Sequence, residues 1–130
     1  MSATALSAGS TALGAAANAS GFQSTAIGAL STASGVDSSA IGTGATASGE
    51  SSQASGYKAN AIGQESIAIG PFATASGIES TAIGSIANAS AISATAIGLL
   101  SNASGAASIA VGRFAKASNA YGVAVGNVAE

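Results

Sequence analysis

The stretch Ser66-Ile67-Ala68-Ile69-Gly70-Pro71-Phe72-Ala73-Thr74-Ala75-Ser76-Gly77-Ile78-Glu79 holds two copies of one seven-residue unit. Each copy has a small residue, a variable residue, Ala, a variable residue and Gly, followed by two further variable residues. The unit repeats through all 130 residues, with Gly at every seventh position except Ser7, Ala91 and Asn119. The Ala two places before that position is present without exception. Such a strict period predicts a repeat architecture.

The seven-residue period does not indicate a coiled coil. A coiled coil needs large apolar residues at its two seam positions, whereas the constant residues here are Ala and Gly. Gly in every second turn would also destabilise a helix by about 1 kcal/mol each. In a strand, the small residue, Ala and Gly point to one side and the two residues between them to the other. We therefore expect a five-residue strand and a two-residue turn in each unit.

A second period of 14 residues is superimposed on the first. The residue before Gly alternates between apolar and Ser, as in Ile27 and Ser34 or Ile69 and Ser76. One coil therefore contains two strands, and the chain predicts about nine coils that rise about 4.8 Å each. Only Ala, Ser and Gly point inward, so we expect a thin interior. The predicted fold class is all-β, a parallel β-roll (solenoid) of 14-residue coils that forms a single domain over residues 1–130.

The pattern is broken in one coil, at residues 50–63. Ser55 occurs where an apolar residue is expected, Ile62 occurs where Ser is expected, and Gln53 and Lys58 add polarity. Because the spacing of Ala and Gly is undisturbed, we expect the roll to continue unbroken. Ser55, Gln53 and Lys58 then form a polar layer across an interface between chains, and Ile62 lies exposed as a candidate ligand contact. The alternative is a coil that is reshaped locally so that Ile62 returns inward.

The large apolar residues lie outside the coil, on one strand face and in the turns at both edges. Residues 14 apart stack directly, so these positions form apolar columns. A contiguous apolar surface of this size marks an interface between molecules. We therefore expect the hydrophobic core to lie between chains, in an obligate oligomer. The expected interface residues are Leu13, Ile27, Ile41, Ile67, Ile69, Ile83, Ile97, Ile109, Val111, Val123, Val125, Leu30, Phe72, Ile86, Leu100 and Phe114.

The composition excludes several classes of function. The chain has no Cys and no His, which removes thiolate chemistry, the usual zinc ligands and the commonest general base. Three basic residues against five acidic ones give a net charge of −2, so the chain lacks the basic patch that nucleic acid requires. We expect no enzyme activity, no catalytic residue, no cofactor and no metal.

Several side chains are candidate ligand contacts, and some have an alternative role. Glu65 and Glu79 should lie one coil apart, and together with Asp37 and Glu50 they also fit a solvated edge that limits aggregation. Tyr57 and Tyr121, in turns, fit ligand binding and packing equally well. The full candidate ligand surface is Tyr57, Ile62, Glu65, Glu79, Arg113, Lys116 and Tyr121.

The repeat resembles the head repeats of trimeric autotransporter adhesins, the YadA-like heads of Gram-negative bacteria. Their Ser-Val-Ala-Ile-Gly strand is similar to residues 66–70, 108–112 and 122–126, and their Ser-x-Ala-x-Gly strand to residues 31–35. The resemblance covers essentially the whole chain. It implies a left-handed roll, a homotrimer around one axis, and a place at the tip of a fibre anchored in the outer membrane. The chain would then be a fragment of that fibre, without its stalk and membrane anchor.

The resemblance also implies a function. Heads of this family bind host extracellular-matrix proteins, of the collagen, fibronectin or laminin class, or the host cell surface, through many repeated contacts. One collagen-binding motif of the family has Asn before the strand, where this chain has Glu65 and Ala107. Two alternatives remain open. The chain could be a structural spacer without its own ligand, or an ice-binding solenoid that uses outward pairs such as Thr32 and Ser34.

Overall fold

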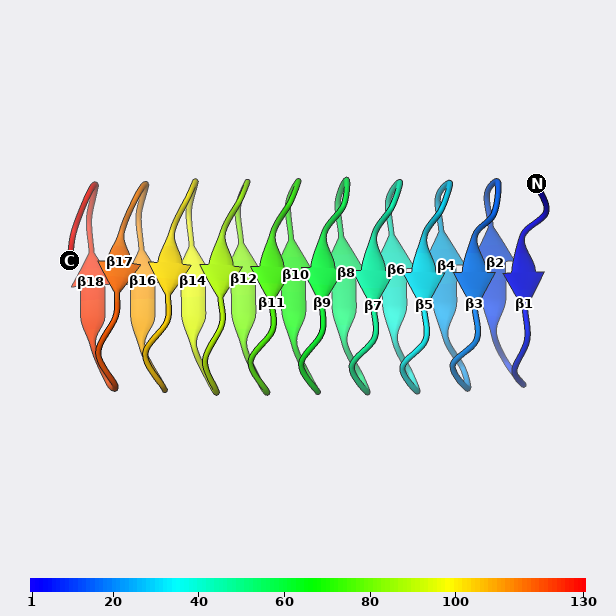
Figure 1. The fold of residues 1–130 in the computed structure, drawn as a ribbon, viewed down its shortest axis with the longest axis horizontal. Helices are drawn as coiled ribbons and strands as arrows, with labels where there is room; N and C mark the ends of the chain where they lie inside the picture. Colours follow the sequence, from blue (N-terminus) through cyan, green and yellow to red (C-terminus); the bar gives the residue numbers. More distant parts are fainter.

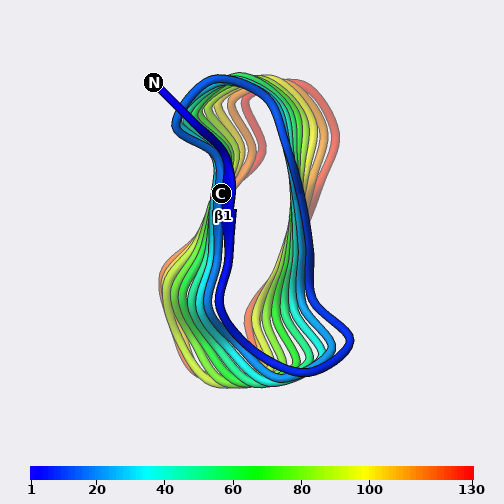
Figure 2. The ribbon, with the colours of Figure 1, turned by 90° about the vertical axis from the view of Figure 1, so that its right-hand side faces the viewer.

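Nine coils stacked along one axis make up the computed structural model, which describes residues 1–130 and contains no helix (Figure 1). Each coil contributes one strand to each of two nine-stranded parallel sheets. The chain runs down one sheet and up the other as it advances, and the winding is left-handed (Figure 2). No segment forms an apolar helix of membrane-spanning length. The predicted all-β parallel solenoid of about nine coils is confirmed.

Sheet A contains the odd-numbered strands, each of two residues. Each strand pairs only with the strands one coil away, so the order along the roll follows the sequence. Each strand has one outward side chain, Thr, Asn or Lys, followed by an Ala. The strands are β1 (Thr4–Ala5), β3 (Asn18–Ala19), β5 (Thr32–Ala33), β7 (Thr46–Ala47), β9 (Asn60–Ala61), β11 (Thr74–Ala75), β13 (Asn88–Ala89), β15 (Asn102–Ala103) and β17 (Lys116–Ala117).

Sheet B contains the even-numbered strands, each of three residues. Its central Ala points inward and its two flanking residues point outward. The strands are β2 (Thr11–Leu13), β4 (Thr25–Ile27), β6 (Ser39–Ile41), β8 (Gln53–Ser55), β10 (Ile67–Ile69), β12 (Thr81–Ile83), β14 (Thr95–Ile97), β16 (Ile109–Val111) and β18 (Val123–Val125).

The strands are shorter than the five residues predicted, because both ends of each unit belong to the turns. Gly28, after β4, has a φ of +122° and so leaves the extended conformation. Ser31, the first residue of the next unit, closes the turn: its N–H donates to the carbonyl of Gly28 at 3.2 Å. Its Oγ donates to the same carbonyl at 2.8 Å. The small residue that begins each unit therefore ends a turn rather than starting a strand.

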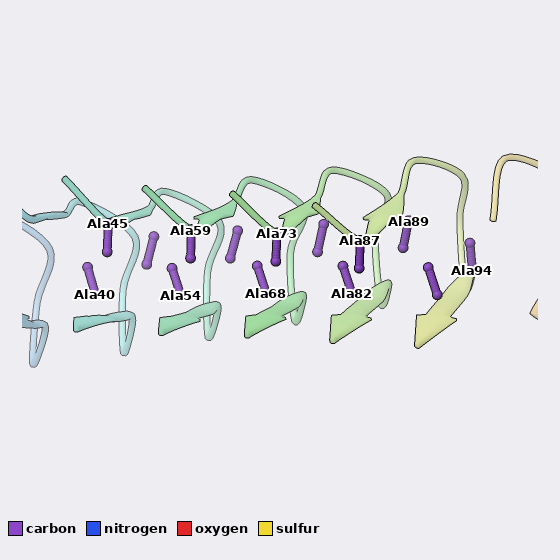
Figure 3. Close-up of a cluster of buried hydrophobic side chains, with 14 of the residues drawn as sticks. Ala40, Ala45, Ala54, Ala59, Ala68, Ala73, Ala82, Ala87, Ala89 and Ala94 are labelled. Carbon is purple, nitrogen blue, oxygen red and sulfur yellow. The ribbon is translucent and has the colours of Figure 1, made fainter. Parts of the chain in front are cut away.

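The interior is built from alanine. Ala68 pairs in register with Ala54 and Ala82 of the neighbouring coils, and the Ala side chains of the two sheets point toward each other (Figure 3). All 23 buried hydrophobic residues are Ala, and the buried polar residues are all Ser. The predicted thin interior of small residues is confirmed. Since each buried methyl contributes only about 0.8 kcal/mol, the 97 backbone hydrogen bonds carry much of the stability.

Glycine at the seventh position lets successive coils stack closely. A Cβ on Gly70, whose φ is +122°, would lie 2.7 Å from the carbonyl oxygen of Gly84. A Cβ on Gly63, after a sheet A strand, would overlap the carbonyl of Gly77. Neither position leaves room for a side-chain carbon. The column after the sheet B strands is Gly throughout, whereas the column after the sheet A strands holds Ser7, Ala91 and Asn119 in place of Gly.

The second residue of every turn adopts the left-handed conformation, a feature the sequence analysis did not predict. Sixteen residues other than Gly have φ between 53° and 60°, among them the β-branched Ile86 and Val128. Gly9 and Gly44 occupy the same columns, with φ of +71° and +68°. A left-handed β-branched residue is strained. Such a residue therefore indicates that its side chain is needed on the surface where it lies.

Candidate functional site

The roll presents four surfaces, namely the outer faces of the two sheets and the two edges formed by the turns (Figure 2). We call the turns that follow the sheet B strands the upper edge, at the top of Figure 2, and those that follow the sheet A strands the lower edge. The structure contains no pocket and no group of three Asp, Glu, His or Cys side chains that could hold a metal ion.

The outer face of sheet B carries the main apolar column. The third residue of each strand is Leu, Ile or Val in eight of the nine strands, and Ser55 is the exception. These side chains pair in register, as Ile69 does with Ile83. All of them are exposed or half-buried in the single chain, and none is buried. A second column, at the first strand position, is mostly polar but includes Ile67, Ile109 and Val123.

The upper edge continues this apolar surface. Its left-handed column includes Leu30, Phe72, Ile86, Leu100 and Phe114, all of them exposed. All sixteen predicted interface residues therefore lie on one connected surface, the outer face of sheet B and the upper edge. The structure brings together the residues that the sequence analysis grouped.

Aromatic and cationic side chains meet at two places on the upper edge. The rings of Tyr57 and Phe72 pack edge to face, with centroids 5.4 Å apart and an interplanar angle of 82°. The Nζ atom of Lys58 lies 5.4 Å from the Tyr57 centroid and 5.9 Å from the Phe72 centroid. Farther along the roll, the guanidinium carbon of Arg113 lies 4.6 Å from the centroid of Phe114. Both cations are held against aromatic rings at the surface.

The lower edge combines apolar and acidic side chains. Four exposed apolar residues lie in its first turn position, Phe22, Val36, Ile78 and Ile92. Four consecutive turns of this edge each carry one carboxylate, and these are Asp37, Glu50, Glu65 and Glu79. The edge therefore differs in charge from the upper edge, whose only charged residues are cations.

The outer face of sheet A is polar and regular. One of its two columns consists of Thr, Asn and Lys, and the other of Ser, apart from Leu6 in the first coil and Ile62, which is 46% exposed. Gln53 and Ser55, half a coil earlier, pair in register with Ile67 and Ile69 of β10. The expectation that the roll continues unbroken through this coil and leaves Ile62 outside is confirmed.

The seven candidate ligand residues are not brought together. Ile62 and Lys116 lie on the outer face of sheet A, and the other five lie on the edges. Tyr57 and Arg113 belong to the upper edge, whereas Glu65, Glu79 and Tyr121 belong to the lower edge.

Sequence analysis missed one exposed apolar residue of the upper edge. Leu99 is exposed in the first turn position, beside Leu100. It could have been found by extending the 14-residue spacing to the first position of these turns, where Tyr57 and Arg113 also lie.

Comparison with known proteins agrees with this architecture. The family model described as "YadA head domain repeat (2 copies)" matches residues 5–31, 19–45, 33–59, 47–73, 61–85, 75–101 and 103–129. No curated protein matches the chain. Among solved structures, the crystal structure of the collagen-binding domain of the Yersinia adhesin YadA is similar, with a TM-score of 0.86 and 36% identity. The similarity covers 95% of this chain and 69% of that one. With matches along nearly its whole length, the chain belongs to the family of YadA head domain repeats.

Proposed function

We propose that this chain is an adhesin head on the surface of a Gram-negative bacterium, and that it binds host extracellular-matrix proteins as a homotrimer. The observation that carries the proposal is the likeness to the YadA collagen-binding domain along 95% of the chain. Neither comparison favours a spacer or an ice-binding role. The head would lie at the outer end of a fibre, where a matrix protein can reach it.

Assembly of copies is supported by the distribution of apolar side chains. The interior contains only Ala, Ser and Gly, and every Leu, Ile, Val, Phe and Tyr lies outside it. A contiguous exposed apolar surface larger than a few hundred Å² normally marks an interface. The face of sheet B and the upper edge would be covered if three copies turned sheet B toward a common axis.

The backbone of the upper edge supports the same assembly. Ile86 has a φ of +59° and is 47% exposed in the single chain. Gly would adopt this conformation without strain, yet the position holds a β-branched apolar residue. Such strain persists where the side chain is needed. Burial of Ile86 against another copy would supply that need.

In this assembly the outer face of sheet A is turned to solvent and becomes the ligand surface. Ile62 and Lys116 lie on it, and Ile62 supplies an apolar contact within a field of Thr, Asn and Ser. A fibrous matrix protein presents repeated sites, so three identical faces would bind it with high avidity even where each contact is weak.

The test is binding of the purified chain to immobilised collagen, fibronectin and laminin, with albumin as the blank surface. We expect saturable binding to at least one matrix protein. Ile62→Ser should weaken that binding by about fivefold to tenfold, whereas Ser90→Ala, in the same column two coils away, should leave it unchanged. Absence of binding to all three would contradict a matrix-binding role and leave the spacer.

A further inference from the structure

The charged side chains of the roll are sorted by edge. Four of the five carboxylates, Asp37, Glu50, Glu65 and Glu79, lie on the lower edge. Two of the three cations, Lys58 and Arg113, lie on the upper edge. Since the third cation lies on the face of sheet A and the fifth carboxylate at the last residue, neither edge carries a charge of the opposite sign.

The two edges are too far apart to pair within one chain. Five residues of each seven-residue unit connect a turn of one edge with a turn of the other, which corresponds to about 17 Å of extended backbone. The two edges lie at opposite ends of the sheets (Figure 2). This distance exceeds the Debye length of about 8 Å at physiological ionic strength. The cations and carboxylates of the edges are therefore available to other molecules of complementary charge.

Residues 50–65 place polar side chains on three surfaces at once, namely the outer face of sheet B, the upper edge and the lower edge. Gln53 and Ser55 interrupt the apolar face of sheet B, where Ser55 pairs in register with Ile41 and Ile69. Lys58 is the only charged residue in the left-handed column of the upper edge. Glu50 and Glu65, on the lower edge, precede and follow this cation by about half a coil each. The apolar column of sheet B and the left-handed column of the upper edge thus become polar at one height along the roll, and this height lies within the run of carboxylates on the lower edge.

A closed ring of parallel copies joins unlike edges. When each copy turns sheet B toward the axis, the upper edge of one copy meets the lower edge of the next, because the interface is heterologous. With the copies at equal height, Lys58 of one copy lies between the heights of Glu50 and Glu65 of the next, about 2.4 Å along the axis from each. Phe72 lies one coil beyond Lys58 on the upper edge, and Val36 and Ile78 lie on either side of Glu50 and Gln64 in the first turn position of the lower edge.

We propose that the segment from Glu50 to Glu65 forms a polar layer between copies of this chain, in which Lys58 pairs with Glu50 and Glu65 of the neighbouring copy. Gln53 and Ser55 of the copies meet in the same layer. A copy displaced by one coil would bury these two polar side chains against Ile67 and Ile69, which is unfavourable without hydrogen-bond partners. The layer therefore favours the closed ring over a displaced, open assembly. This inference rests on the proposed homotrimer, and it assigns Glu65 to the interface rather than to the ligand surface.

The conformation of Lys58 suits this role. Its Nζ lies within 6 Å of the rings of both Tyr57 and Phe72, which themselves pack edge to face. The rings hold the cation at the surface of the edge without neutralising it. Less side-chain entropy is then lost when the ion pair forms across the interface.

A charge-reversal cycle tests the pairing. Lys58→Glu places like charges opposite each other at every contact, and we expect the melting temperature of the assembly to fall by about 5–10 °C. Glu50→Lys with Glu65→Lys should lower it in the same way. The triple variant, with all three reversals, should melt above both. The matched control is Lys116→Glu, which makes the same change in net charge on the outer face of sheet A and should shift the melting temperature by less than about 2 °C.

Salt and light scattering separate the possible outcomes. In 1 M NaCl, where the Debye length is about 3 Å, the difference between Lys58→Glu and Lys116→Glu should shrink. Equal shifts for these two variants, or a triple variant no more stable than Lys58→Glu, would overturn the polar layer while the trimer stands. A wild-type chain that is a folded monomer by light scattering would overturn the homotrimer itself, and the layer with it.

Discussion

Gly77 and Ala91 occupy equivalent positions in successive coils, but their backbones are bonded differently. The N–H of Gly77 donates to the carbonyl of Ala89 at 3.4 Å, and the equivalent bond from Ala91 to Ala103 is absent. A Cβ on Gly77 would overlap the carbonyl oxygen of Ala91. The column therefore accepts a side chain at Ala91, where this hydrogen bond is not formed, whereas a side chain at Gly77 would displace the backbone of the next coil.

Gly77→Ala should consequently destabilise the roll by about 3 kcal/mol per chain or more, because the backbone of the next coil must move. Ala91→Gly is the matched change in the opposite direction. It should alter stability by less than about 1 kcal/mol, since a restored hydrogen bond offsets the greater chain entropy of Gly. Chemical denaturation of the two variants measures both effects. Similar losses at both sites would contradict the close stacking of the coils.

Substitutions in the alanine interior should be far more damaging than those on the polar face. Ala68 and Ala82 are fully buried between the sheets, so Ala68→Leu or Ala82→Leu forces the sheets apart, at a cost of about 1–3 kcal/mol or more. Thr32→Val, on the outer face of sheet A, should be nearly silent. Thermal melts followed by circular dichroism compare them, and equal shifts would refute the inward and outward assignment.

The hydroxyls of the buried Ser column should differ in their contribution. Ser66 Oγ is buried without a hydrogen-bond partner, so Ser66→Ala should leave stability unchanged or raise it by about 1 kcal/mol. Ser31 Oγ donates to the carbonyl of Gly28 at 2.8 Å, and Ser31→Ala should lose about 1 kcal/mol. The denaturation midpoints of Ser66→Ala and Ser31→Ala, each compared with that of the unchanged chain, measure this difference. A greater loss for Ser66→Ala would mean that this hydroxyl has a partner in solution.

Substitution of the left-handed turn residues by Gly should have opposite effects at an interface and at an exposed edge. Ile86 and Glu79 have nearly equal φ values, 59° and 57°, and Gly would relieve about 1 kcal/mol of backbone strain at either position. Glu79→Gly should therefore leave the melting temperature unchanged or slightly higher. Ile86→Gly should lower it, because the loss of about 2–3 kcal/mol of apolar burial between copies exceeds the relief. Stabilisation by both changes would show that Ile86 remains in water.

Much of the fold could be predicted from the sequence because each coil repeats the same local rules. Alternation of side chains in a strand placed Ala inside and Ile69 outside, and the 14-residue spacing gave the register of Ser55 with Ile41 and Ile69. The left-handed conformation of the second turn residue was not predicted. Only Gly9, Gly44 and Asp37 mark these turns, since the other turn residues are of types that rarely adopt this conformation.

The candidate site was predictable only in part. The apolar columns follow from the period, so the sequence grouped Phe72, Ile86 and Phe114 on one surface correctly. The contacts of Lys58 with Tyr57 and Phe72 depend on side-chain conformations that no spacing determines. The ligand cannot be identified from the repeat pattern, because the structure has no pocket whose shape and polar groups would select one.

The central claim is that the hydrophobic core of this protein lies between chains. Size-exclusion chromatography with multi-angle light scattering, at micromolar concentration, tests it most directly. We predict a single species with three times the 11.9 kDa mass of one chain, and β-structure that is lost together with the trimer. A folded, β-rich monomer of 11.9 kDa would contradict the claim.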